Sequence, residues 1–189
     1  GKSQVIIPSL TYRRLADVVY WAGLVPVFVD IDPASLAISP DAVAANINED
    51  TALILAVHPI VNCCDVAAIT AIAARTEIPL VFDAVESAHE TLGGRRIGSF
   101  GTAEVFSLHA SKLINGLEGG YVCTSDPAFA DALKRYLAAE QFNFAGGFHS
   151  GLNGLPHPGH AAFALAGLDD LQRNITHNRS IYERYRSCL

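Results

Sequence analysis

Short apolar runs alternate with helix-like patterns from the start of the chain to Asp83. Continuous apolar runs, typical of buried strands, lie at 5–7, 26–29, 52–57 and 79–82. Between them, apolar residues recur at helical spacing over 13–22, 40–46 and 65–75. The alternation predicts the α/β fold class, in which helices sandwich a mostly parallel mixed sheet.

The pattern changes after Asp83. Glycine-rich turns lead to two shorter strand-like runs, expected at 104–107 and 121–124. A helix is expected next, at 126–140. The stretch 142–159 is rich in glycine, proline, asparagine and histidine without periodicity, which predicts a long loop. Apolar residues at helical spacing then predict one long helix over 160–187. Because no repeat or linker interrupts the pattern, we expect one domain over 1–189.

Composition narrows the possible classes of function. Half of the 189 residues are apolar and 17% are charged, which excludes a disordered chain. The net charge of −6, without a lysine or arginine run, argues against nucleic acid and anionic membrane surfaces as partners. Every apolar run is far shorter than the roughly 18 residues of a membrane span, so we expect a cytoplasmic protein. The sequence lacks methionine and opens with Gly-Lys-Ser, which suggests an internal piece of a longer chain.

The cysteines and histidines indicate no metal site. The four cysteines, of which Cys63 and Cys64 are adjacent, fit neither a disulfide framework nor a zinc pair, and we expect small buried side chains. The histidines at 149, 157 and 160 have no nearby acidic partner at a metal-ligand spacing. His58 follows a strand and is interpreted as a hydrogen-bonded structural histidine, with a place in a pocket wall as the alternative.

Polar residues that directly follow apolar runs are the first candidates for chemistry, because open α/β sheets bind ligands at the carboxyl ends of their strands. Asp83 ends one run, and Lys112 lies among small and apolar residues shortly after Ser107. Each has a plainer interpretation, Asp83 as a helix cap or backbone acceptor and Lys112 as a solvated lysine. Together, a carboxylate for a pyridine nitrogen, a lysine for an aldehyde and a serine for a phosphate are the parts of a pyridoxal 5'-phosphate (PLP) site.

Segments along most of the chain carry a resemblance to a known family. Residues 107–112, Ser-Leu-His-Ala-Ser-Lys, with Glu118-Gly119-Gly120 beyond them, resemble the S-F-H-A-T-K and E-G-G motifs of the DegT/DnrJ-type sugar aminotransferases. Further segments similar to this family lie at 8–12, 22–32, 62–65, 83–87, 93–100, 151–154 and 160–162. The resemblance implies the large domain of a PLP-dependent transferase with the aspartate-aminotransferase fold.

The resemblance also implies roles for individual residues. Lys112 is expected to bind the PLP aldehyde covalently and to move protons, Asp83 to meet the pyridine nitrogen and Ser107 to bind the phosphate. Tyr12 matches an aromatic residue that stacks on the pyridine face. The alternative for Tyr12 is a loop tyrosine packed on a neighbouring strand.

Asn153 and Glu86 are matched less simply. Asn153 corresponds to an asparagine that reaches the phosphate of the neighbouring subunit, and its alternative is a turn residue in a glycine-rich loop. Glu86 is expected near the phenolic oxygen of the cofactor, where the family usually has glutamine or histidine. Because a carboxylate beside a phenolate is repulsive, we expect Glu86 either to be protonated or to face the substrate amine.

A reaction follows from the same resemblance. An amino acid, expected to be glutamate, gives its amino group to a keto sugar linked to a nucleotide or a natural product, in a homodimer with a shared active site. The family's N-terminal phosphate loop and C-terminal small domain are missing from 1–189, and the sequence departs from the family at 13–17 and 155–158. These departures leave an alternative, a non-catalytic homologue that serves as a partner or regulatory subunit.

Overall fold

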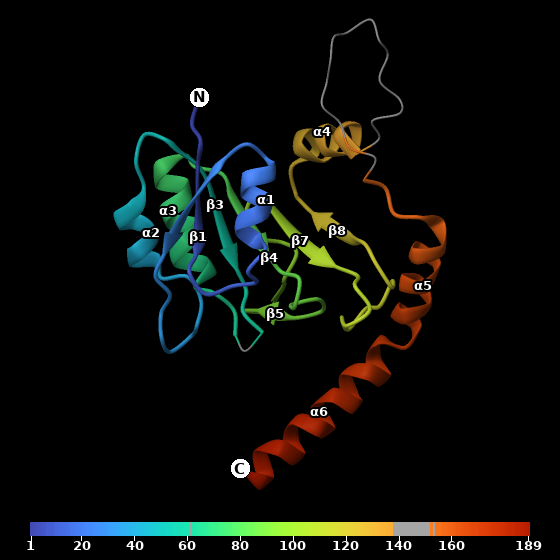
Figure 1. Ribbon diagram of the computed structural model, residues 1–189. Helices are drawn as coiled ribbons and strands as arrows, with labels where there is room; N and C mark the ends of the chain where they lie inside the picture. The colour runs from blue at the N-terminus through green and yellow to red at the C-terminus, as the bar shows by residue number, and fades with distance from the viewer. Residues whose placement is uncertain (61, 138–151, 153) are drawn as a thin grey trace, which may run out of the picture. The chain divides into compact units, whose positions relative to one another are not determined.

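The computed structural model of the protein describes residues 1–60, 62–137, 152 and 154–189 (Figure 1). The described residues form two compact units. The first unit consists of Gly1–Phe106 and Val122–Asp126, and the second of Ser107–Tyr121 and Pro127–Leu189. The hydrophobic pattern shows no sign of this division, because each unit is assembled from segments that are discontinuous in the sequence.

A mixed sheet organises the first unit. Within the described part of the chain, six strands form this sheet in the order β2-β1-β3-β4-β7-β8. Strand β1 pairs in parallel with β2 and β3, and β4 pairs in parallel with β3 and β7. Figure 1 shows β8 running opposite to β7, and the sheet thus confirms the predicted fold class. The strands are β1 (Gln4–Pro8), β2 (Val25–Val29), β3 (Thr51–Val57), β4 (Leu80–Asp83), β7 (Ala103–Ser107) and β8 (Gly120–Cys123).

Helices bury both faces of this sheet, namely α1 (Leu15–Trp21), α2 (Pro40–Asn46) and α3 (Val66–Thr76). On one face, Val5 and Ile7 of β1 pack in a cluster with Val19 of α1. On the other face, Ile6 belongs to a cluster that includes Ile69 of α3. Neighbouring residues of one strand therefore enter opposite cores, as expected for a parallel strand that is covered on both sides.

A short hairpin follows β4 and consists of β5 (Thr91–Leu92) and β6 (Arg95–Arg96). Gly93 and Gly94 join its strands with φ angles of 56° and 80°. Positive φ at both central residues of a two-residue turn favours Gly-Gly. Beyond the hairpin, Gly101 passes so close to β4 that a Cβ would lie 2.7 Å from the carbonyl oxygen of Leu80. Glycine at this position lets the chain enter β7 directly beside β4.

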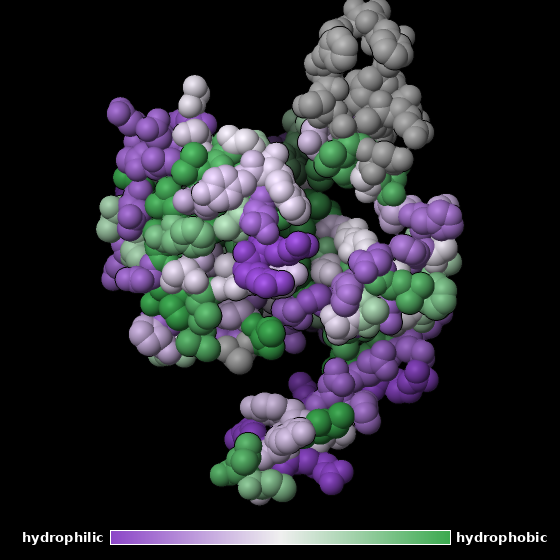
Figure 2. Space-filling model, viewed as in Figure 1, coloured by the Kyte–Doolittle hydropathy of each residue, from purple (hydrophilic) through white to green (hydrophobic). Residues whose placement is uncertain are grey.

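The second unit contains the connection from β7 to β8 and the helices α4 (Pro127–Leu137), α5 (Pro158–Asp169) and α6 (Leu171–Cys188). Close approaches join its distant segments, since a Cβ on Gly116 would lie 3.3 Å from the Cβ of Ala164. The surface of α6 is mostly hydrophilic (Figure 2). None of the helices in the described ranges is both long and apolar enough to span a membrane.

The predicted single helix over 160–187 is wrong, because the structure contains α5 and α6 with a break at Asp170. Asp170 has φ −90° and ψ −4°, ends α5 and precedes α6. The helix dipole makes a carboxylate unfavourable at the end of a helix and favourable at its start, so consecutive aspartates at 169 and 170 favour a new helix here. The Asp170 side chain makes no capping hydrogen bond and pairs with Arg173 of α6 at 2.7 Å. Of the predicted loop 142–159, residues 142–151 and 153 lie outside the described residues, and Pro158 and Gly159 belong to α5.

Candidate functional site

A cavity of about 370 Å³ lies where β1, β3 and β4 end in the first unit. Its lining includes Tyr12, Asp83 and Glu86, together with apolar residues from the loops after β2 and β3. Two of these apolar residues, Leu36 and Ile60, are exposed, and Figure 2 shows apolar surface beside their loops. The carboxyl edge of a parallel sheet is where α/β folds bind their ligands. The cavity is therefore the candidate site of the first unit.

Asp83 is the last residue of β4 and is held in place through its backbone and its side chain. Its carbonyl oxygen accepts a hydrogen bond from the backbone N–H of His58 at 2.9 Å. Its Oδ1 accepts a hydrogen bond from the backbone N–H of Val85 at 3.1 Å. The alternative prediction for Asp83, that it accepts a hydrogen bond from the backbone, holds for its Oδ1. The same carboxylate also lines the cavity. The result is a half-buried carboxylate with a fixed orientation at the cavity wall.

Tyr12 and Thr11 follow β1 and line the same cavity. Tyr12 is 68% exposed, so its ring offers a flat surface to a ligand. The Tyr12 carbonyl oxygen accepts a hydrogen bond from Leu15 at 2.9 Å, which fixes the backbone at the start of α1. The Oγ1 of Thr11 is buried and has no hydrogen-bond partner within the described ranges. Since buried hydroxyls are normally satisfied, Thr11 is a polar group that a ligand in the cavity could satisfy.

Glu86 lies in the turn after β4 and its side chain is exposed at the cavity. Two hydrogen bonds of 2.9 Å fix the turn, from Ala84 N–H to the Val105 carbonyl and from Ser87 N–H to the Ala84 carbonyl. An exposed carboxylate at a cavity wall is placed to meet a cationic group that enters from solvent. This position is compatible with the expectation that Glu86 faces an amine.

Ser107 is the last residue of β7, and Lys112 lies on the loop between β7 and β8; both belong to the second unit. The Oγ of Ser107 accepts a hydrogen bond from the backbone N–H of His109 at 3.2 Å. The carbonyl oxygen of His109 accepts a hydrogen bond from the backbone N–H of Lys112 at 2.9 Å. The Nδ1 of the His109 ring lies 2.9 Å from the Oγ of Ser111. The loop is therefore a hydrogen-bonded turn that carries a hydroxyl at one end and a half-buried ammonium group at the other.

The structure thus brings Tyr12, Asp83 and Glu86 to one cavity of the first unit. Asn153 lies outside the described residues, so its expected role stays a prediction. Across the part of the chain that the structure describes, histidine, cysteine and acidic side chains form no group of three or more that could hold a metal ion.

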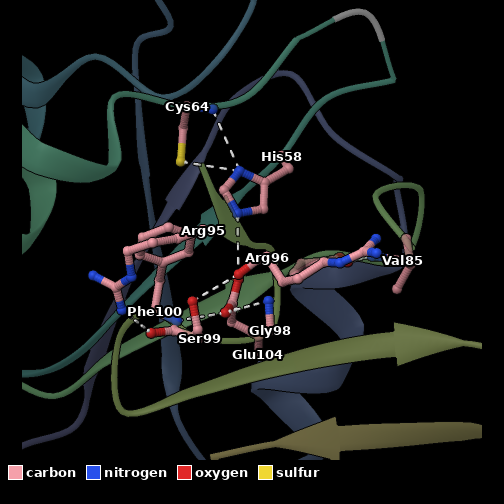
Figure 3. A network of polar contacts seen from close by, with 10 residues as sticks. His58, Cys64, Val85, Arg95, Arg96, Gly98, Ser99, Phe100 and Glu104 are labelled. Atoms are coloured by element: carbon pink, nitrogen blue, oxygen red, sulfur yellow. Dashed lines mark hydrogen bonds and ion pairs between the residues drawn. The ribbon is translucent and has the colours of Figure 1, made fainter. Parts of the chain in front are cut away.

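The structure contains a buried polar network beside the cavity that the sequence did not predict (Figure 3). The His58 side chain is fully buried and lines the cavity, so both interpretations of this histidine describe part of its environment. Its Nε2 lies 3.6 Å from Oε1 of Glu104, whose side chain is also fully buried. A charged residue inside the apolar run 103–106 was the signal that could have pointed to Glu104, because charged side chains are rarely buried unless they are paired.

The sheet topology and the cavity at its carboxyl edge define the class of α/β proteins that bind ligands at strand ends. Within this class, residues 1–189 match the model of the DegT/DnrJ/EryC1/StrS aminotransferase family. The protein belongs to this family, as the resemblance predicted.

Two relatives carry the same name, L-glutamine:2-deoxy-scyllo-inosose aminotransferase. The protein from Micromonospora echinospora is 42% identical over 127 residues, which are 67% of this chain and 30% of the relative. The protein from Streptomyces lividus is 37% identical over 135 residues, which are 71% of this chain and 32% of the relative. The crystal structure of DesI with its TDP-sugar product has a TM-score of 0.92 at 35% identity, over 98% of this chain and 47% of DesI. The chain therefore matches about a third of the length of these two relatives and about half of DesI.

Proposed function

We propose that residues 1–189 are the cofactor-binding, large-domain portion of a PLP-dependent aminotransferase that delivers an amino group to a keto sugar or a keto cyclitol. The observation that carries this proposal is the cavity at the carboxyl ends of β1, β3 and β4, which both Asp83 and Tyr12 line. Membership of an aminotransferase family over the whole chain supports it. The names of the two relatives and of the DesI complex support a cyclic keto substrate.

The residues at the cavity fit the chemistry of PLP. A fixed carboxylate, Asp83, suits a protonated ring nitrogen, and the exposed ring of Tyr12 suits a flat heteroaromatic face. The unsatisfied hydroxyl of Thr11 adds a polar group to a mostly apolar wall. A volume of about 370 Å³ lies within the range of small-molecule pockets.

Ser107 and Lys112 carry the chemical groups that the phosphate and the aldehyde of the cofactor require. Because the Oγ of Ser107 already accepts a hydrogen bond from His109 N–H, its hydroxyl proton can be directed to a phosphate oxygen. Lys112 would bind the aldehyde through its Nζ. Its backbone hydrogen bond to the His109 carbonyl limits the freedom of the turn that carries it.

When bound, PLP supplies an aldehyde for the amino group and a ring that stabilises negative charge on the substrate carbon. Lys112 then has two tasks, to hold the cofactor covalently and, once released, to carry a proton between the substrate carbon and the cofactor carbon. Asp83 keeps the ring nitrogen protonated, because a neighbouring carboxylate favours the cationic form. Glu86, exposed at the cavity, is assigned to the incoming amine.

The proposed amino donor is L-glutamine, the donor in the names of both relatives, with L-glutamate, the donor expected from the resemblance, as the competing candidate. The two differ only in the side-chain amide or carboxylate, so parallel assays with the two donors distinguish them. We further propose a homodimer whose partner subunit contributes Asn153 to the phosphate. Light scattering on the full-length protein tests this, and a monomer that retains PLP with undiminished affinity would contradict the shared site.

Reconstitution of the full-length protein with PLP tests the proposed function. We expect a visible absorbance band from bound PLP, and amino transfer to 2-deoxy-scyllo-inosose or a nucleotide-linked keto sugar with either donor. Lys112→Ala is the matched variant and should lose both. A wild-type protein that holds PLP but transfers no amino group to any such ketone would instead be the non-catalytic homologue.

A further inference from the structure

His58, which lines the cavity, forms a buried polar pair with Glu104 (Figure 3). Both side chains have an exposed fraction of zero, and the Nε2 of His58 lies 3.6 Å from the Oε1 of Glu104. Within the described ranges, neither of these two atoms has a hydrogen-bond partner. Since each is buried and faces the other just beyond hydrogen-bond distance, a proton on the nitrogen or the oxygen that points at the other atom is the arrangement that best compensates both.

Glu104 is anchored by its second oxygen. Its Oε2 accepts hydrogen bonds from the backbone N–H groups of Gly98 and Phe100, each at 2.6 Å. The guanidinium of Arg95 covers the Phe100 ring at 4.5 Å and donates to the Ser99 carbonyl at 2.7 Å, which stiffens the same segment. Oε1 of Glu104 is consequently held in one direction, towards His58 (Figure 3).

The opposite nitrogen of His58 favours the same tautomer. The backbone N–H of Cys64 donates to Nδ1 in a long hydrogen bond of 3.4 Å, so Nδ1 acts as an acceptor in this structure. The Sγ of Cys64 lies 3.4 Å from the same nitrogen, and burial raises the pKa of this thiol to about 12, which keeps the sulfur protonated as a second donor. The ring proton of a neutral His58 is therefore on Nε2, where it points at Glu104.

The fixed imidazole supports Asp83. The His58 ring stacks on Phe82, the residue before Asp83, with a centroid distance of 5.0 Å and an interplanar angle of 9°. The backbone N–H of His58 donates to the carbonyl oxygen of Asp83 at 2.9 Å. Side chain and main chain of His58 thus contact both residues at the carboxyl end of β4.

Stability alone gives little reason for such a pair. A buried ionic or polar pair can often be replaced by apolar side chains of similar volume without loss of stability, because burial of the charge costs about as much as the pairing returns. The surrounding core is apolar, with Phe82 and Ile54 fully buried. The pair lies where this core meets the cavity, which is where a fixed orientation matters for a ligand.

We propose that Glu104 and His58 are positioning residues for Asp83: Glu104 holds His58 as the Nε2–H tautomer, and the immobilised ring keeps the Asp83 carboxylate aligned with the ring nitrogen of the cofactor. This inference rests on the proposed PLP site. It assigns no contact with the cofactor to either residue.

Nuclear magnetic resonance of the full-length protein with ¹⁵N-labelled histidine tests the tautomer without any cofactor. We expect His58 to show a protonated Nε2 and an unprotonated Nδ1. In Glu104→Gln, the amide can keep an oxygen on Gly98 and Phe100 and turn its NH₂ towards His58, so Nε2 becomes the acceptor. The ring proton then moves to Nδ1, which gives up the long 3.4 Å bond from the Cys64 N–H and can donate to the Cys64 Sγ instead. A wild-type His58 with its proton on Nδ1, or a tautomer unchanged by Glu104→Gln, would overturn the proposed pair.

Titration with PLP tests the effect on Asp83. Glu104→Gln should weaken PLP binding on the order of tenfold, the lower end of the effect of removing a partner that orients a ligating side chain, and should shift the absorbance maximum of bound PLP. Thr51→Val is the control: Thr51 is fully buried at the opposite end of β3, and its loss should lower stability but leave PLP affinity and spectrum unchanged. An inverted tautomer with wild-type affinity and spectrum would refute the positioning role and leave the proposed function intact. A wild-type protein that binds no PLP would refute both the positioning role and the proposed function. The tautomer measurement would still show whether Glu104 and His58 form the proposed pair.

Discussion

The backbone N–H of His58 donates to the carbonyl oxygen of Asp83 at 2.9 Å, across the carboxyl ends of β3 and β4. This bond continues the parallel pairing in which Val57 lies opposite Asp83. Both His58 and Asp83 therefore line the cavity from adjacent strands, and this main-chain hydrogen bond joins them. The placement of the candidate site is thus a direct result of strand register.

Lys112 is predicted to be the residue that binds PLP covalently. In Lys112→Ala, the full-length protein should fold as the wild type does, because this half-buried lysine acts chemically, but it should lose the visible band and all transfer activity. Borohydride reduction followed by peptide mapping should label Lys112. The control is Lys134→Ala, which removes an exposed lysine 3.9 Å from Asp131 and should leave the band unchanged. A label on Lys134 or Lys2 would contradict the assignment.

Asp83→Asn should retain the shape of the side chain and remove its charge. Loss of a charge-assisted hydrogen bond costs about 1.5–3 kcal/mol, so PLP binding should weaken by roughly 10- to 150-fold and most of the rate should disappear. Equilibrium titration and single-turnover kinetics measure the two effects. Asp41→Asn, in the exposed first turn of α2, removes a carboxylate elsewhere and should change neither. Normal turnover in Asp83→Asn would contradict the prediction, and the role of Asp83 would then be structural, as the acceptor of the hydrogen bond from the Val85 N–H.

The residues that the sequence predicted best are those placed by strand ends. Asp83 directly follows an apolar run, and Tyr12, which the family resemblance indicated, lies in the loop after the first strand. Parallel strands bring their carboxyl ends to one edge, which explains why both residues line one cavity. Glu104 lies within a strand, and its partner at position 58 is remote in sequence. Burial and pairing of this kind depend on tertiary packing, which the period of the apolar residues does not report.

The prediction of a single helix over 160–187 was wrong for a related reason. The apolar period continues through both α5 and α6, and the break depends on the backbone at Asp170, where a favourable helix start competes with continuation. Hydrophobic spacing indicates which residues share a face of a helix. It does not reveal a single residue at which the helical hydrogen bonding is interrupted.

Gly101 is predicted to be the glycine on which folding depends most. A Cβ at this position would lie 2.7 Å from the Leu80 carbonyl oxygen and 3.0 Å from Phe82, and its φ is +62°. Gly101→Ala should destabilise the protein by about 2–5 kcal/mol, the sum of left-handed strain and overpacking. Gly94→Ala is the matched control, since its φ is +80° with no atom within 4 Å of a Cβ, and it should cost about 1–2 kcal/mol. Equal losses in denaturant unfolding would show that the close approach to Leu80 carries no cost.

Cys64 is predicted to make stability fall at high pH. Burial raises its pKa from 9.0 to about 12 in the folded protein, so above pH 9 the unfolded chain loses a proton that the folded protein keeps. The stability is fully present below pH 9 and declines towards pH 12, by up to about 1.4 kcal/mol per pH unit for one proton. Cys64→Ala should show a shallower decline in denaturant unfolding across this range than the wild type. Cys63→Ala is the comparison, and identical slopes for Cys64→Ala and wild type would contradict the prediction.

Tyr12 is predicted to contribute to PLP binding through its ring and not through its hydroxyl. The residue is 68% exposed and lines the cavity that contains Asp83, so its face is accessible to a flat ligand. Stacking of aromatic rings is worth about 0.5–1.5 kcal/mol. Tyr12→Phe should therefore keep wild-type affinity, whereas Tyr12→Ala should weaken PLP binding by roughly 2- to 12-fold, as measured by equilibrium titration. Tyr20→Ala removes a similarly exposed ring from α1, outside the cavity lining, and should have no effect. If Tyr12→Phe lost as much affinity as Tyr12→Ala, the hydroxyl would be the binding group, and the stacking role assigned to Tyr12 would be wrong.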